Sequence, residues 1–193
     1  MKLLLHICCG PCALYPVKEL LSKKFDKITG FFYNPNIHPP SEYKRRKDAL
    51  MSVGTAHCAV PTKNTGFEII YPEYKMEEYF RFVFSNNVGD GLKPSPTERC
   101  NLCWELRLSE TADFAKVNGF DAFTTTLLVS PYQDHEKIKK IGERIADEKG
   151  VKFYYQDFRS GFKDGQEQAK KENLYRQKYC GCVFSELERV KVK

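Results

Sequence analysis

Lys2-Leu3-Leu4-Leu5-His6-Ile7-Cys8-Cys9-Gly10-Pro11-Cys12 is the stretch from which the architecture can be inferred. Residues 2–7 have the length and apolar character of a short buried strand, and Gly10-Pro11 ends it. Residues 13–21 then carry leucine and valine at helical spacing. A buried strand that runs directly into a helix predicts the first βα unit of a parallel sheet, with the cysteines at the carboxyl end of the strand.

The rest of the chain repeats this alternation. The patterns predict further strands at 28–33, 67–71, 122–128 and 151–155, and helices at 42–56, 76–84, 95–117 and 134–149, with a short last helix capped by Ser185. The fold class is therefore α/β, a mainly parallel sheet with flanking helices. We expect a single domain over residues 1–193, in which the C-terminal segment from about 157 to 193 completes the active site. Ligand sites of such sheets lie beyond the carboxyl ends of the strands.

Composition excludes several classes of protein. The chain has 193 residues, of which 41% are hydrophobic and 29% charged, as in ordinary globular proteins rather than disordered ones. Its apolar runs are too short for a transmembrane helix, and the stretch before Cys8 is too short for a signal peptide, so we expect a cytoplasmic protein with no membrane partner. The formal net charge of +6 suits a polyanionic partner.

The chain contains eight cysteines, too few for a disulfide scaffold. In a reducing compartment, clustered cysteines are more often metal ligands or catalytic groups. Cys58 stands alone beside His57 and is interpreted as an isolated thiol. The other seven fall into three groups: Cys8, Cys9 and Cys12; Cys100 and Cys103; Cys180 and Cys182.

Each group has a spacing that suits metal or redox chemistry. The helix after Cys8 and Cys9 lowers thiol pKa through its dipole, which favours the thiolates that bind metal. Cys100 and Cys103 are three residues apart, so they share a helix face. The pair in Cys180-Gly181-Cys182 can bind one metal or close a strained, redox-active disulfide.

Counting thiols favours an iron–sulfur cluster over a structural zinc. A structural zinc needs one closed set of four ligands, whereas a cluster takes thiolates from distant segments. Two plus two cysteines complete such a set, which leaves the tail pair over and Cys12 as a spare. The excess thiols indicate redox chemistry or a second metal. His6 fits either a residue that orients a metal ligand or a core histidine.

Two alternatives from other functional classes stay open on these observations. Cys9-Gly10-Pro11-Cys12 between a strand and a helix is typical of a thioredoxin-like dithiol oxidoreductase. The positive charge, with the basic run at residues 44–47, would suit a zinc-stabilised RNA-binding module. An ATP-dependent enzyme is disfavoured, because cysteines stand where the phosphate-binding loop would belong.

Five ordered motifs resemble one known family. They are residues 5–12; Thr97-Glu98-Arg99-Cys100 through Cys103 to Arg107-Leu108; residues 120–128 followed by Ser130-Pro131-Tyr132; residues 155–159; and residues 177–182. Together they are similar to the epoxyqueuosine reductase family QueH over nearly the whole chain. Cys58 is not part of the pattern.

This resemblance implies a fold like the adenine nucleotide α-hydrolase (HUP-like) group and a cobalamin-independent enzyme. Its reaction would be the last step of queuosine biosynthesis, two-electron reduction of the epoxide of epoxyqueuosine at the wobble position of tRNA, with an external low-potential electron donor. The resemblance assigns a [4Fe-4S] cluster to Cys8, Cys9, Cys100 and Cys103. It treats Cys180 and Cys182 as a redox pair or as ligands of a second, mononuclear iron.

Two further residues are candidates for the chemistry. Asp157 is either a metal ligand or proton donor, or a surface carboxylate paired with Arg159. Tyr179 is a possible proton donor or a packing residue. A base of the anticodon loop would be splayed into the pocket, with its phosphates near basic residues such as Arg45, Arg46 or Lys178.

Overall fold

A five-stranded, wholly parallel sheet forms the centre of the protein, in the order β3-β2-β1-β4-β5. The computed structural model describes residues 1–57, 67–86 and 97–191. The strands are Lys2–His6 (β1), Lys27–Phe31 (β2), Glu68–Ile70 (β3), Ala122–Thr125 (β4) and Lys152–Phe153 (β5). This order is that of doubly wound nucleotide-binding folds, so the predicted α/β class with a parallel sheet is confirmed.

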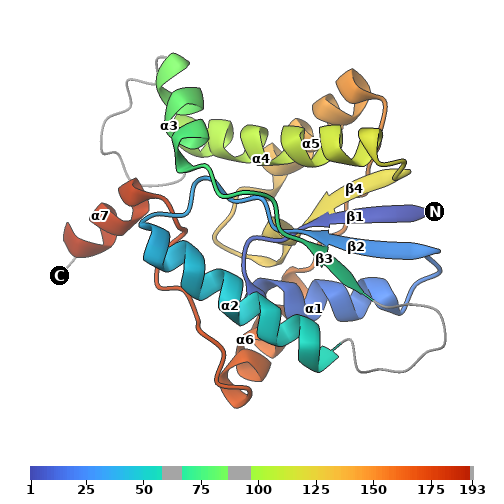
Figure 1. The fold of residues 1–193 in the computed structure, drawn as a ribbon, viewed down its shortest axis with the longest axis horizontal. Coiled ribbons are helices and arrows are strands. Elements are labelled where there is room, and N and C mark those ends of the chain that lie inside the picture. The colour runs from blue at the N-terminus through green and yellow to red at the C-terminus, as the bar shows by residue number, and fades with distance from the viewer. Residues whose placement is uncertain (58–66, 87–96, 192–193) are drawn as a thin grey trace.

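Helices cover both faces of this sheet (Figure 1). Helices α4 and α5 lie on one face, and α1, α2 and α6 on the other, while α7 lies beyond the carboxyl ends of the strands. None of the described helices is long and apolar enough to cross a membrane. The helices are Gly10–Leu21 (α1), Pro40–His57 (α2), Met76–Ser85 (α3), Glu98–Val117 (α4), His135–Lys149 (α5), Phe162–Lys171 (α6) and Val183–Lys191 (α7).

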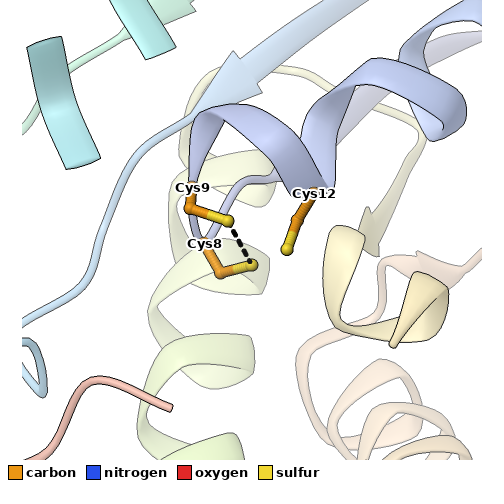
Figure 2. Close-up of side chains that lie close together, drawn as sticks. All are labelled: Cys8, Cys9 and Cys12. Carbon is orange, nitrogen blue, oxygen red and sulfur yellow. Dashed lines mark hydrogen bonds between the residues drawn. The ribbon is translucent and has the colours of Figure 1, made fainter. Parts of the chain in front are cut away.

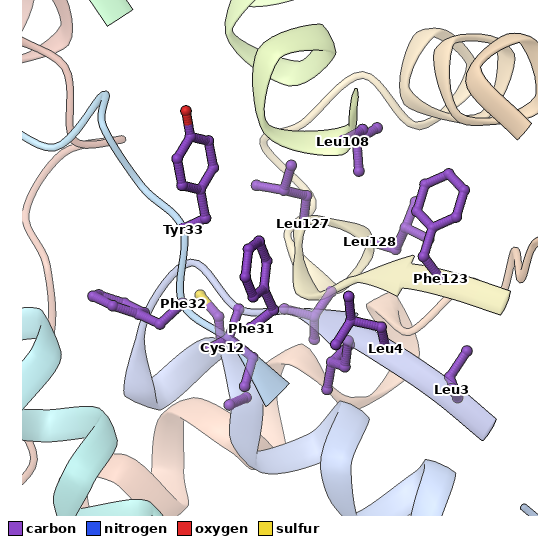
Figure 3. Close-up of a cluster of buried hydrophobic side chains, with 14 of the residues drawn as sticks. Leu3, Leu4, Cys12, Phe31, Phe32, Tyr33, Leu108, Phe123, Leu127 and Leu128 are labelled. Carbon is purple, nitrogen blue, oxygen red and sulfur yellow. The ribbon is translucent and has the colours of Figure 1, made fainter. Parts of the chain in front are cut away.

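The hydrophobic core is centred on β1, which lies between β2 and β4. Its three leucines are fully buried. A strand covered by helices on both faces must be apolar on both, which explains why its sequence does not alternate. Figure 3 shows its Leu3 and Leu4 with Phe31 of β2, Phe123 of β4 and Leu108 of α4.

Strand β4 is shorter than the sequence predicts. The run 122–128 was expected to be one strand, but it leaves the sheet after Thr125, and Thr126–Val129 form a 3-10 turn (η1). The cause is the Thr125 hydroxyl, which accepts a hydrogen bond from the backbone N–H of Leu127 at 3.1 Å. This turn carries Thr126 toward the end of β1, where its hydroxyl contacts Cys8.

Two predicted helix starts have different outcomes. The cap expected at Ser95 lies outside the described residues, and α4 begins at Glu98 after Thr97. The last helix begins at Val183, three residues before the start at residue 186 that a cap at Ser185 predicts. Ser185 instead donates its hydroxyl to the carbonyl of Cys182 at 2.8 Å.

A buried arginine of α2 holds the C-terminal segment in place. Arg46 is 1% exposed and donates to the Glu42 carboxylate at 2.8 Å. Its two terminal nitrogens donate to the carbonyls of Tyr179 and Cys180, each at 2.9 Å. The expectation that Arg46 meets phosphate is therefore wrong, because its guanidinium is buried and hydrogen-bonded within the fold.

Gly181 allows this close approach. Its φ of 136° is a conformation that favours glycine, and a Cβ there would lie 3.2 Å from both Arg46 Nη1 and Ile37. The Gly181 carbonyl also accepts from the His38 N–H at 2.8 Å. The peptide between Cys180 and Cys182 is thus fixed from two sides.

A contrast between two glycines tests the packing of α1 on α2. A Cβ at Gly10 would lie 2.9 Å from the Ala49 backbone, whereas one at Gly165 would meet its nearest atom at 3.6 Å. We expect Gly10→Ala to lower the free energy of unfolding by about 1–3 kcal/mol. Gly165→Ala, within α6, should raise it by up to about 1 kcal/mol. Urea denaturation measures both, and equal effects would contradict the packing described.

Substitution of Arg46 tests whether its guanidinium holds the C-terminal segment in place. Arg46→Met should lower the free energy of unfolding by about 3 kcal/mol, the low end for a broken buried ion pair. The low end applies because Arg45 and Tyr175 still contact Glu42. Arg45→Met is the matched control, since its half-exposed side chain should contribute no more than about 1 kcal/mol. Equal urea midpoints for the two variants would refute this role of Arg46.

Candidate metal and substrate site

Three cysteines converge where β1 runs into α1; we name Cys8, Cys9 and Cys12 the three-thiol group. Cys9 is the residue that caps α1, and Cys12 lies in its first turn. All three sulfurs lie within 4.8 Å of one another. Figure 2 shows them pointing toward a common point, with Cys8 and Cys9 Sγ 3.9 Å apart. This spacing suits one metal ion bound by thiolates.

Neighbouring groups lower the pKa of Cys8 and so favour its thiolate form. Hydrogen bonds from the Cys12 thiol, then from Cys9 and Thr126, hold the pKa of Cys8 well below its usual range. Burial raises the pKa of Cys9. The Gln177 amide, from the C-terminal segment, donates to Cys12 Sγ at 3.3 Å. Cys12, interpreted from the sequence as a spare, is therefore a full member of the group.

A second set of sulfurs lines a cavity of about 590 Å³; we name Cys100, Cys103, Cys180 and Cys182 the four-thiol group. Cys100 and Cys103 share one face of α4, as their spacing predicts. Burial raises the pKa of Cys103, and proximity to the other three sulfurs raises it further. Cys180 is exposed and Cys182 buried, so the cavity is accessible from one side.

The cavity beside the four-thiol group shares lining residues with a cavity beside the three-thiol group. A neighbouring cavity of about 490 Å³ is lined by Cys8 and Cys12 and also by Cys180. A molecule in this second cavity would therefore lie close to sulfurs from both groups. The residues common to both linings are Arg107, Tyr132, Gln133, Lys178, Tyr179 and Cys180.

This arrangement divides the thiols differently from the set implied by the resemblance. That set joins Cys8 and Cys9 to the two cysteines of α4. In the structure the α4 cysteines share their cavity with the tail pair, while Cys8 and Cys9 lie with Cys12. Cys58 lies outside the described residues, and the side chain of His57 is not described either.

The two proposed proton donors have different surroundings. Tyr179 lines both cavities, and its hydroxyl donates to the carbonyl of His38. Burial raises its pKa to about 12. Asp157 lines neither cavity. Two hydrogen-bonding nitrogens of Arg159 engage its carboxylate and hold its pKa at about 2.

His6 is a satisfied core histidine. Its Nε2–H donates to the Tyr33 carbonyl at 3.1 Å, so Nδ1 accepts from the Thr125 hydroxyl at 2.9 Å. Burial, with a contribution from Arg107, lowers its pKa to about 3. The ring is therefore neutral and links the ends of β1, β2 and β4 rather than binding metal.

The mouth of the site carries an exposed aromatic ring and basic side chains. Tyr132 is 78% exposed and packs edge-on against Phe162 at 5.9 Å. Lys178 lines both cavities, and Arg176 and Arg189 each line one. Basic groups around an aromatic ring are typical of single-stranded nucleic-acid sites. Tyr132 belongs to the Ser130-Pro131-Tyr132 motif, but nothing in the sequence indicates its exposure.

Comparisons with known proteins place the chain in a family. The model of the family "Epoxyqueuosine reductase QueH" matches residues 3–188. Proteins of that name from Dehalococcoides mccartyi and Thermotoga maritima are 39% and 36% identical to this chain. The alignments cover 97% and 96% of this chain, and 94% and 91% of the relatives.

A solved structure supports the fold alone. It is described as a predicted subunit of tRNA methyltransferase from Methanocaldococcus jannaschii, with a TM-score of 0.50 and 11% identity. The match covers 88% of this chain and 74% of that one. The family match, by contrast, extends over all the described cysteines, and two relatives align over nearly their full length. This chain therefore belongs to the epoxyqueuosine reductase QueH family.

Proposed function

We propose that this protein reduces the epoxide of epoxyqueuosine in tRNA to queuosine, the last step of queuosine biosynthesis. The observation that carries the proposal is that six cysteines line two adjoining cavities at the carboxyl ends of a parallel sheet, with Cys9 beside two of them. Family membership supplies the substrate. Thiols in such number fit the reductive chemistry that this substrate requires.

The four-thiol group is the proposed site of a [4Fe-4S] cluster, and the three-thiol group that of a mononuclear iron. A cluster takes four cysteines from distant segments, as α4 and the tail provide. Three sulfurs around one ion leave a coordination position open. When bound, the cluster would supply single electrons, and the iron would polarise the epoxide oxygen. The set implied by the resemblance, and a Cys180–Cys182 disulfide, are the alternatives that the variants below distinguish.

The reaction needs two electrons and two protons for each epoxide. Both C–O bonds break, a C=C bond forms, and the oxygen leaves as water. The electrons come from an external low-potential donor. Tyr179 is better placed than Asp157 to deliver a proton, because it borders both cavities and Asp157 borders neither. Its hydroxyl would turn from the His38 carbonyl toward the substrate.

Recognition of the RNA is assigned to the mouth of the site. A base of a single-stranded loop can be splayed out and stacked on an aromatic side chain. Tyr132 offers such a ring beside both cavities, and Lys178 and Arg176 can contact the adjacent phosphates. The net charge of +6 favours association with a polyanion.

Single-cysteine variants test the division of the thiols. Anaerobically purified protein should contain a [4Fe-4S] cluster and one further iron. Cys103→Ser should lose the acid-labile sulfide and most of the iron, because it removes a cluster ligand. Cys9→Ser should keep the sulfide and lose only the single iron. Iron and sulfide analysis with electron paramagnetic resonance (EPR) spectra measures both.

Other cysteine variants sharpen this test. Cys58→Ser is the matched control and should keep all the metal. Loss of sulfide in Cys9→Ser would support the ligand set of Cys8, Cys9, Cys100 and Cys103 instead. Full sulfide in Cys182→Ser would favour the redox disulfide. Stoichiometric zinc without sulfide in the wild type would reject an iron–sulfur enzyme.

Substitution of Tyr132 tests recognition of the RNA. Tyr132→Ala should weaken binding of an anticodon stem-loop carrying epoxyqueuosine by about 1–3 kcal/mol, because a stacked base loses its platform. Tyr132→Phe should retain binding, since it keeps the ring. Phe84→Ala removes an aromatic that is 65% exposed and lines neither cavity, so it is the control. Equal affinities for Tyr132→Ala and wild type would exclude stacking there.

A further inference from the structure

Arg107 is a buried cation between the two thiol groups. It lies on α4 one turn after Cys103, is 2% exposed, and lines both cavities. Its Nε donates to the Cys103 carbonyl at 3.0 Å. Its Nη2 is buried and has no hydrogen-bond partner among the described residues. Burying a guanidinium nitrogen without a hydrogen-bond acceptor is costly. A group bound in the cavities could supply that acceptor.

Other buried arginines have carboxylate partners. Arg46 pairs with Glu42 at 2.8 Å, and Arg99 lies 3.7 Å from Glu188. Within residues 1–57, 67–86 and 97–191, no ion pair of Arg107 with a carboxylate is formed. Burial acts to lower the pKa of Arg107, but the nearby thiols of Cys103, Cys180 and Cys8 outweigh it and raise that pKa. Its charge therefore faces sulfurs from both thiol groups.

We propose that Arg107 is the counter-ion of both thiol groups and that its free Nη2–H donates to a sulfur of the cluster. This inference rests on the cofactors proposed above. The guanidinium stays charged at every pH of interest, so its positive charge is constant. It acts through the cluster, and is thus a positioning and tuning residue rather than one that touches substrate.

The expected consequence is a raised reduction potential. Reduction adds one negative charge to the cluster, and a fixed positive charge nearby stabilises the reduced state. Hydrogen bonds to the cluster sulfurs act in the same direction. Arg107 would therefore ease electron transfer from the external donor without taking part in proton transfer.

The experiment compares reduction potentials of anaerobically loaded variants by EPR-monitored titration with dithionite. Arg107→Gln should shift the potential to more negative values at unchanged cluster content. Arg107→Lys keeps the charge and should shift it less. Arg144→Gln removes the same charge from α5, where Arg144 pairs with Glu105 and Glu148, and should leave the potential unchanged.

An Arg107→Gln protein with full cluster and the wild-type potential would overturn the proposal. If this variant folds but holds no cluster while Arg107→Lys holds one, the need for the charge is supported. Wild-type protein labelled with ¹⁵N-arginine gives an independent test that no folding defect affects. Pulsed EPR of its reduced cluster should detect a ¹⁵N coupling that Arg107→Lys loses, and absence of any coupling would refute the hydrogen bond. Wild-type protein without a cluster would instead refute the cofactor proposed above, on which this inference rests.

Discussion

The parallel pairing of β1 with β2 and β4 places the carboxyl ends of these strands side by side, and the segments that follow them carry residues of the candidate site. His6, the last residue of β1, lies opposite Phe31 and Thr125, the last residues of its two neighbours. The imidazole joins all three ends through the Thr125 hydroxyl and the Tyr33 carbonyl. Cys8 and Thr126 therefore leave the sheet side by side, and α4 and the tail can bring their sulfurs to the same edge.

Much of this arrangement could be predicted from local patterns. The apolar strand before Cys8, the glycine and proline that end it, and the C-x-x-C spacing on α4 all act over a few residues. The end of β4 could not, because three consecutive threonines favour a strand and only the Thr125 side chain turns the chain aside. The place of Cys12 in the three-thiol group could have been predicted from its three-residue spacing from Cys9. The assumption of a single set of four ligands left Cys12 out.

Buried arginines show the limit of sequence reasoning most clearly. Arg46 and Arg107 each contact the residue one helical turn earlier, Glu42 and Cys103 respectively. The spacing is visible in the sequence. The burial of the two arginine side chains is not, because the segments that cover them are far away in the chain. One guanidinium is neutralised by a carboxylate and serves the fold. The other faces sulfurs and retains an unused donor, a cost that a purely structural residue would not need to carry.

The order of the thiols along the chain has a consequence for biogenesis. All three sulfurs of the three-thiol group precede those of the four-thiol group in the chain, so they leave the ribosome first. The four-thiol cavity needs residues 180 and 182, so it cannot form before these residues have been synthesised. Nascent chains therefore expose the three-thiol group before the cavity beside it can form. A chain interrupted before Cys180 would therefore carry the three-thiol group without the cavity that adjoins it.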